Sequence, residues 1–129
     1  MLPNLKKGEY FVANKVIYDL EQPKRGDIIV YKDGIKHGDF VKRIIGLPGE
    51  KIKVEGGRVY INSEVLTESY LYSSTHTSPG KFLTEGIEIL IPLDNYVVMG
   101  DNRDMSYDSR DSGFVDRKYI IGKYWFRYH

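Results

Sequence analysis

The residues best able to do chemistry lie in one loop, residues 100–113, between two apolar stretches. The loop holds four aspartates, two arginines and three serines. Its aspartates lack the spacing of an EF-hand calcium loop, and its arginines would repel a cation. One interpretation is a solvated loop held by ion pairs. The other is an ion-paired scaffold that orients a hydroxyl group, for which Ser106 is the candidate.

A lysine within an apolar stretch is the second feature. Residues 39–45 predict a strand, and the alternation of side chains along a strand places Lys42 on the same face as Phe40 and Ile44. Burial disfavours the charged ammonium, so such a lysine can lose its proton near neutral pH and act as a base. On this stretch alone, a lysine that extends from an edge strand into water remains the alternative.

Composition limits the classes of protein. The chain has 129 residues, which suits one domain, and a formal net charge of +1, which argues against nucleic-acid binding through phosphate attraction. It has no cysteine, which excludes disulfides, thiolate metal sites and a cysteine nucleophile. No apolar stretch reaches the roughly 18 residues of a membrane span. We therefore expect the sequence as given to form a soluble domain.

The patterning predicts a mainly β fold. Short runs rich in Val, Ile and Tyr alternate with turn residues, and Gly56-Gly57 between two such runs predicts a hairpin. One short helical turn is expected over residues 116–120. Residues 64–85 have the least pattern and predict a surface insertion or loop within a single domain of residues 1–129. The predicted strands are residues 10–13, 27–32, 39–45, 51–55, 58–61, 88–91, 96–99 and 120–126.

Four stretches taken in order resemble the conserved boxes of bacterial type I signal peptidases. They are residues 1–9, 25–31 and 41–50 and the pattern Gly-Asp-Asn-Arg-Asp-x-Ser-x-Asp-Ser-Arg at residues 100–110. The resemblance implies an irregular, multi-strand signal-peptidase-like β fold with a small β-hairpin or loop insertion. It also implies a serine endopeptidase with a Ser–Lys dyad that removes signal peptides from exported preproteins. No metal or organic cofactor is implied.

The resemblance assigns roles residue by residue. Lys42 matches the general base, and Ser106 matches the serine whose hydroxyl orients the lysine amine, so these are the two predicted catalytic residues. Four residues match positions that support the site: Asp101, Arg103, Asp108 and Arg110. Four match substrate-binding positions, two on the strand that pairs with the extended substrate and two that line its pockets: Phe40 and Val41, and Met1 and Leu5.

In that family, the nucleophilic serine immediately precedes the methionine aligned with Met1, and a membrane helix comes before it. We therefore expect that the sequence begins just after the nucleophile and that this polypeptide alone is inactive. The parent protein is expected at the extracytoplasmic face of the cell membrane. Its expected partners are signal peptides of exported preproteins and the membrane surface, with no nucleic acid, and we expect a monomer.

Three other hypotheses fit parts of the sequence. A non-catalytic relative could bind exported or surface proteins during assembly, although a binding protein needs no desolvated lysine. A self-cleaving repressor peptidase would share the Ser–Lys chemistry, but it is not expected to carry the pattern at residues 100–110. A purely structural β module leaves the order of the four stretches unexplained. The residue before Met1 would discriminate the peptidase from the binding protein.

Overall fold

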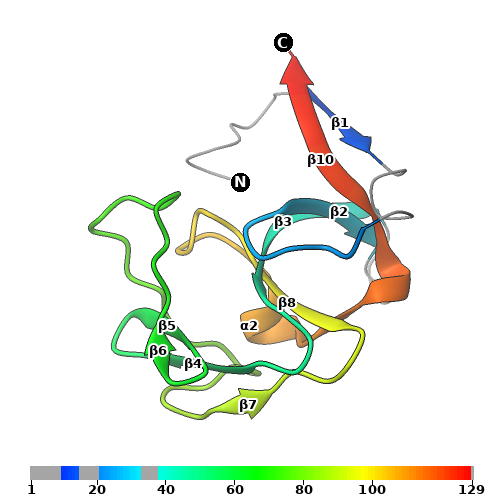
Figure 1. The fold of residues 1–129 in the computed structure, drawn as a ribbon. Coiled ribbons are helices and arrows are strands. Elements are labelled where there is room, and N and C mark those ends of the chain that lie inside the picture. The colour runs from blue at the N-terminus through cyan, green and yellow to red at the C-terminus, as the bar shows by residue number, and fades with distance from the viewer. Residues whose placement is uncertain (1–9, 15–20, 33–37, 129) are drawn as a thin grey trace.

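Two antiparallel sheets lie against each other in the computed structural model, which describes residues 10–14, 21–32 and 38–128. The larger sheet has six strands in the order β1-β10-β2-β3-β8-β9, and the smaller has four in the order β6-β5-β4-β7. In Figure 1 the smaller sheet lies at the bottom, while β1 and β10 extend from the opposite end. The predicted mainly β fold is confirmed.

The strands are mostly short. Those of the larger sheet are β1 (Tyr10–Asn14), β2 (Ile28–Lys32), β3 (Asp39–Gly46), β8 (Asn95–Met99), β9 (Val115–Asp116) and β10 (Ile120–Tyr128). Those of the smaller sheet are β4 (Lys51–Glu55), β5 (Arg58–Ile61), β6 (Glu64–Val65) and β7 (Ile89–Leu90). Two short helical pieces, α2 (Ser109–Ser112) and the 3-10 helix η1 (Arg117–Tyr119), connect β8, β9 and β10.

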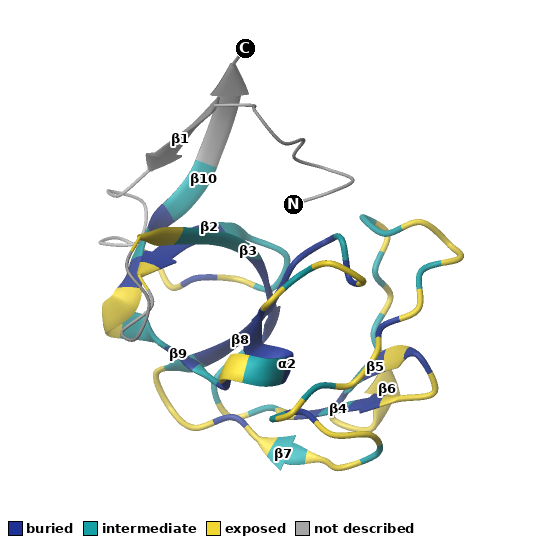
Figure 2. Cartoon of the chain, turned by 180° about the vertical axis from the view of Figure 1, so that it is seen from behind, coloured by how far each residue is buried: buried dark blue, intermediate teal, exposed yellow. Residues whose placement is uncertain are grey.

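The end of β3 and most of β8 are buried on both faces, which explains the apolar runs Ile44-Ile45 and Tyr96–Met99. Ile45 and Val97 pack into a cluster with the smaller sheet, whereas Ile44 and Val98 pack into a second cluster on the other face. Neighbouring side chains on a strand point to opposite faces, so two buried faces require apolar residues at consecutive positions. Figure 2 shows β8 and the start of α2 as the buried centre of the molecule. The loop at residues 100–113 begins directly after β8, so this buried strand positions its first residues.

The predicted strands agree closely with those observed. Strands β4 and β5 have the predicted bounds, and they are joined by the predicted turn, in which both Gly56 and Gly57 have positive φ. The short turn expected over residues 116–120 is η1. The two-residue strands β6 and β9 and the helix α2 were not predicted, because elements of two to four residues carry no periodic signal.

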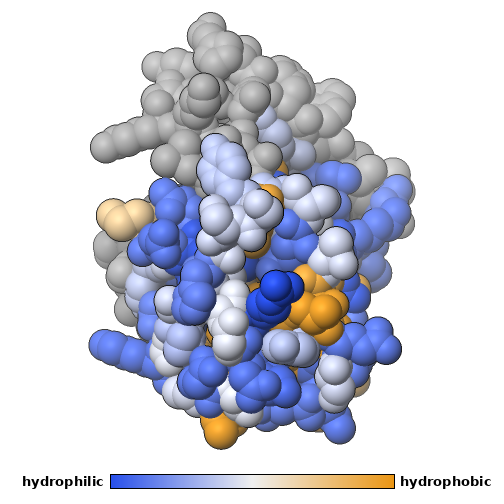
Figure 3. Space-filling model, turned by 90° about the vertical axis from the view of Figure 1, so that its left-hand side faces the viewer, coloured by the Kyte–Doolittle hydropathy of each residue, from blue (hydrophilic) through white to orange (hydrophobic). Residues whose placement is uncertain are grey.

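The segment at residues 64–85, expected to be a surface insertion or loop, is irregular except for β6. Many of its residues are exposed, but Thr77 and Leu83 are buried, and Leu83 belongs to the cluster between the sheets. Figure 3 shows the face that carries this segment, which is mainly hydrophilic with one apolar cluster. The segment therefore contributes both to the surface and to the core.

Among the described residues, no helix has the length and apolar character needed to cross a bilayer. The described helices have only four and three residues.

The buried centre makes a stability prediction. Ile44 is fully buried, whereas Ile87 is 56% exposed. Ile44→Ala should lower the free energy of unfolding by about 2–5 kcal/mol because it leaves a cavity in the core. The same substitution at Ile87 should change it by less than about 0.5 kcal/mol. Urea denaturation of both variants measures the difference, and equal effects would contradict the packing described here.

Candidate active site

Lys42 lies on β3 opposite Ile29 of β2, and its side chain is half-buried. Burial lowers the pKa of its amine from the ordinary value of 10.5. The charge of Asp108 acts in the opposite direction and raises that pKa, while the charge of Arg110 lowers it. The net direction favours a neutral amine, as the sequence predicted for a lysine among apolar neighbours.

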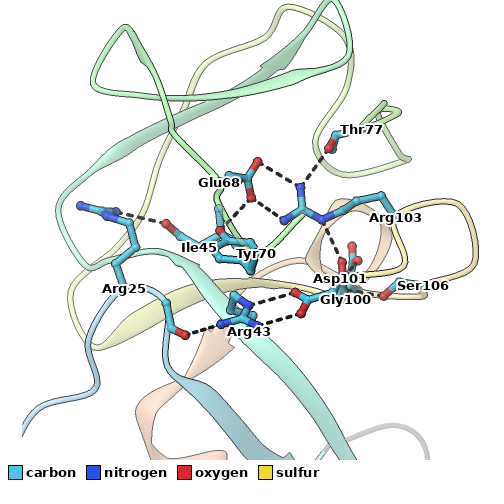
Figure 4. Close-up of polar contacts among 12 residues, drawn as sticks. Arg25, Arg43, Ile45, Glu68, Tyr70, Thr77, Gly100, Asp101, Arg103 and Ser106 are labelled. Carbon is cyan, nitrogen blue, oxygen red and sulfur yellow. Dashed lines mark hydrogen bonds and ion pairs between the residues drawn. The ribbon is translucent and has the colours of Figure 1, made fainter. Parts of the chain in front are cut away.

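The hydroxyl of Ser106 and the amine of Lys42 both lie close to Gly100. A methyl group on Gly100 would lie 2.2 Å from Ser106 Oγ and 3.6 Å from Lys42 Nζ. Only glycine therefore leaves space for the hydroxyl. The N–H of Gly100 donates a hydrogen bond of 3.1 Å to Ser106 Oγ, which leaves the proton of the serine free to point elsewhere. Figure 4 shows this contact at the edge of the loop.

Asp108 and Arg110 form a buried ion pair behind Ser106. The carboxylate of Asp108 is fully buried and accepts from Nε and Nη2 of Arg110, both at 2.9 Å. It also accepts from the N–H of Gly100 at 3.1 Å. Burial would raise the pKa of Asp108, but the hydrogen bonds and charge of Arg110 and the backbone N–H groups hold it below the ordinary 3.8. The group is therefore an anion at neutral pH.

The same aspartate begins α2, because its side chain caps the backbone N–H of Arg110. The helix ends at Gly113, whose φ of 92° favours glycine. Within α2, Ser109 Oγ accepts from the N–H of Val98, which attaches the helix to β8. One short turn of helix thus connects the ion pair to the central strand.

Asp101 is buried and paired with a residue from outside the loop. Its two carboxylate oxygens accept from Nε and Nη2 of Arg43 at 2.9 and 2.8 Å. Arg43 also donates to the carbonyl of Gly26. Because Arg43 directly follows Lys42 on β3, this bidentate pair joins the strand of the lysine to the loop of the serine.

Arg103 points toward the 64–85 segment. Its Nε donates to the carbonyl of Gly100 at 2.8 Å, and its Nη1 donates to Thr77 Oγ1 at 2.9 Å. The other end of its guanidinium forms an ion pair with both oxygens of Glu68. Tyr70 donates its hydroxyl to Glu68 at 2.8 Å, and its ring lies 4.1 Å from the guanidinium carbon of Arg43. Figure 4 shows these side chains gathered on one side of Gly100.

One edge of β3 beside the lysine has no paired strand among the residues that the structure describes. The strand pairs with β2 along residues 39–43 but with β8 only from Arg43 onward. Ile44 directs its N–H and C=O toward Asp27 and Gly26 on the β2 side. Because this direction alternates along a strand, the main-chain groups of Val41 face the opposite edge. No strand in the described part of the chain pairs with residues 39–42 at that edge.

The structure thus brings Lys42, Ser106, Asp108 and Arg110 together, with Asp101 and Arg103 on the far side of Gly100. Phe40 and Val41 lie on β3, both half-buried, and the ring of Phe40 stacks on Tyr31 at 5.9 Å. Met1 and Leu5, the predicted pocket residues, lie outside the described residues. In the described part of the chain, no group of His, Asp or Glu side chains is arranged to hold a metal ion.

Sequence reasoning missed Arg43, Glu68, Tyr70 and Thr77. Arg43 carried a usable signal, because it adjoins Lys42 and bears a charge within an apolar strand. The other three lie in the segment with the least pattern. The many charged residues of the loop at 100–113 were the one indication that such partners exist elsewhere, because buried arginines and aspartates require them.

Comparisons with known proteins identify the family of the chain. The family model "Signal peptidase, peptidase S26" matches residues 1–129. The chain is 40% identical to signal peptidase I of Leptolyngbya laminosa over 131 residues, which covers 95% of the chain and 61% of that protein. It is 34% identical over 139 residues to signal peptidase IB of Staphylococcus aureus strain COL, covering 99% of the chain and 72% of that protein.

The chain therefore belongs to the signal peptidase family, peptidase S26, as the resemblance predicted. A crystal structure of a signal peptidase I from Enterococcus faecalis V583 has a similar fold, with a TM-score of 0.66 and 29% identity. It covers 80% of this chain and 97% of its own. The chain spans 61% of the length of the Leptolyngbya protein, so it corresponds to part of such an enzyme.

The buried ion pair predicts a pH-dependent stability. Asp108→Asn should lower the free energy of unfolding by about 3–5 kcal/mol at pH 7, because it leaves Arg110 buried without its carboxylate. The folded pKa of Asp108 lies below 3.8, so its contribution is fully present above pH 3.8 and is lost as the pH falls through the folded pKa. The difference between wild type and variant should therefore shrink in acid. Denaturant titrations at several pH values measure it.

Asp104 offers a matched control in the same loop. Its side chain is exposed, so Asp104→Asn should change the stability by less than about 0.5 kcal/mol at any of these pH values. A constant difference between wild type and the Asp108 variant down to strong acid would contradict the ion pair.

Proposed function

We propose that this chain is the catalytic domain of a signal peptidase I, an endopeptidase that removes signal peptides from exported preproteins by a Ser–Lys mechanism. Besides membership of the family, one observation carries the proposal. The half-buried amine of Lys42, with its lowered pKa, lies with the hydroxyl of Ser106 beside Gly100. A general base must be neutral to take a proton, and a lysine with a lowered pKa beside a hydroxyl group suits that role.

The mechanism assigns the nucleophile to a serine immediately before Met1, where the family pattern places it. Neutral Lys42 takes the proton of that serine as its oxygen attacks the carbonyl of the scissile bond. The resulting ammonium gives the proton to the departing amine of the mature protein, and the signal peptide stays attached as an acyl group. Lys42 then activates water, which releases the signal peptide and restores the enzyme. Ser106 keeps the amine aimed at this point throughout.

The edge of β3 that has no paired strand among the described residues supports an extended substrate. An extended peptide could add to the edge at residues 39–42 and exchange main-chain hydrogen bonds with Val41. Phe40 and Val41 keep their predicted role in this proposal, and Met1 and Leu5 keep theirs as pocket residues. Recognition through the main chain accepts many preprotein sequences, and small pockets then select the cleavage site.

The proposal places the parent protein at the extracytoplasmic face of the cell membrane, where signal peptides emerge. It acts there as a monomer on the signal peptides of exported preproteins, with its substrate edge near the membrane surface. The names of the relatives, which are signal peptidases, support the substrate class in this proposal.

Replacement of the base tests the mechanism. In the full-length protein with a serine before Met1, Lys42→Ala should lower the rate of preprotein cleavage by at least about a thousandfold, because no other group takes the proton. Ser106→Ala should lower kcat by about ten- to a hundredfold with little change in KM, since it loses orientation rather than binding. The rates of both variants are measured with a preprotein that carries an Ala-x-Ala cleavage site, and the products are quantified by gel electrophoresis.

Lys53 provides the control, because it is another half-buried strand lysine, paired with Glu55. Lys53→Ala should keep near-normal cleavage. Near-normal cleavage by the Lys42 variant would overturn the assignment of the base. A full-length protein that binds preproteins but never cuts them would favour the non-catalytic alternative.

The lowered pKa of Lys42 predicts the pH profile. The base must be neutral, so kcat/KM should rise with pH and level off above the pKa of Lys42 in the free enzyme. Because that pKa lies below 10.5, the rise should be complete at a lower pH than for an ordinary lysine. A profile that stays flat through mildly acidic pH would exclude a lysine base. Initial rates across a buffer series measure it.

A further inference from the structure

The cation of Arg103 depends on a carboxylate from a distant segment. Arg103 is only 3% exposed, and its side chain is fully buried. Its carboxylate partner, Glu68, lies 35 residues earlier in the 64–85 segment, and both of its oxygens contact the guanidinium. A buried guanidinium without such a partner is strongly destabilised. The position of Arg103 is therefore set by Glu68.

Glu68 acts on the second arginine of the site through Tyr70. The hydroxyl of Tyr70 donates to Glu68, and the ring of Tyr70 covers the guanidinium of Arg43. Burial, and then the charge of Glu68, raises the pKa of Tyr70, so its hydroxyl keeps its proton and remains a donor at neutral pH. Glu68 and Tyr70 thus form a cap over both arginines.

The two arginines hold two adjacent residues of the loop. Arg103 holds the carbonyl of Gly100, and Arg43 holds the carboxylate of Asp101. The N–H of the same Gly100 holds the hydroxyl of Ser106. A shift of the backbone at Gly100 would therefore move Ser106. The two residues are closely packed, because a methyl group on Gly100 would lie 2.2 Å from the hydroxyl.

We propose that Glu68 is a positioning residue of the Ser–Lys site, which holds Gly100 through Arg103 and so fixes the hydroxyl of Ser106 toward Lys42. Tyr70 assists by holding Glu68 and covering Arg43. The inference rests on the proposed function for its meaning in catalysis, although the positioning of Lys42 itself can be measured without turnover. It gives the 64–85 segment a part in the active site that no feature of its sequence indicated.

Glu68→Gln in the full-length protein tests the proposal. The glutamine keeps the size of the side chain but removes the charge that Arg103 requires. We expect kcat for preprotein cleavage to fall by about ten- to a hundredfold, because small displacements of reacting groups cost that much. The KM should change by less than about twofold, since the substrate edge of β3 is untouched. Glu55→Gln is the matched control, because it removes an exposed carboxylate paired with Lys53, and it should leave both constants unchanged.

The titration of Lys42 separates positioning from simple electrostatics. Its rate of acetylation against pH, followed by mass spectrometry, reports its pKa without any cleavage. A serine hydroxyl that donates to the neutral amine lowers that pKa, so a displaced Ser106 should raise it. Loss of the negative charge of Glu68 alone would lower it. The charges that act on Lys42 in the structure are those of Asp108 and Arg110, which the variant keeps.

The outcomes are distinct. A lower kcat together with a raised pKa of Lys42 supports the proposal, whereas unchanged values or a lowered pKa overturn it. If Glu68→Gln does not fold, Tyr70→Phe replaces it, because that variant keeps the ring over Arg43 and removes the hydroxyl that donates to Glu68. It should show the same changes in kcat and in the pKa of Lys42, at smaller size. If neither value changes, the proposal is overturned. If the wild type never cleaves a preprotein, the proposed function fails, and the titration of Lys42 alone decides the positioning role.

Discussion

The backbone N–H of Gly100 is the point on which the arrangement depends. It lies 3.1 Å from both Ser106 Oγ and Asp108 Oδ2, so one donor ties the hydroxyl to the buried carboxylate. Asp108 can take this place only because Arg110 balances its charge. A buried ion pair adds little net stability compared with apolar packing, but it is costly to break. The Asp108–Arg110 pair therefore serves mainly to fix the geometry of the loop at residues 100–113.

On the proposed mechanism Lys42 must be neutral although charged residues surround it, and each of these charges is paired with an opposite one. Three carboxylates, Asp101, Asp108 and Glu68, each face an arginine: Arg43, Arg110 and Arg103. Opposite charges held close together weaken each other's field at a distance. Asp108 and Arg110 accordingly act in opposite directions on the pKa of Lys42. Burial then remains the largest influence on the amine. The arginines therefore let a polar loop lie beside a base without charging it.

Local chemistry was readable from the sequence, and long-range pairing was not. The hairpin of β4 and β5 follows from adjacent residues, and the Asp108–Arg110 pair joins residues two apart. The partner of Asp101 is 58 residues away and that of Arg103 is 35 away, so no local pattern could select them. The 64–85 segment looked peripheral because it has no periodicity, yet Glu68 comes from it. Periodicity in the sequence predicts which residues face a core. The carboxylate partner of a buried arginine can be found only once the fold is known.

The choice of a hydroxyl to orient the base follows from the chemistry of lysine. In a Ser–His–Asp triad a carboxylate binds the base directly and stabilises its charged form. A carboxylate bonded to Lys42 would raise its pKa and hold the proton that the reaction must remove. Asp108 instead directs its oxygens to Arg110 and Gly100, so it acts on the lysine through its charge and not through a direct hydrogen bond. On the proposed mechanism, a neutral group that is itself fixed by charges is what allows a lysine to be both oriented and uncharged.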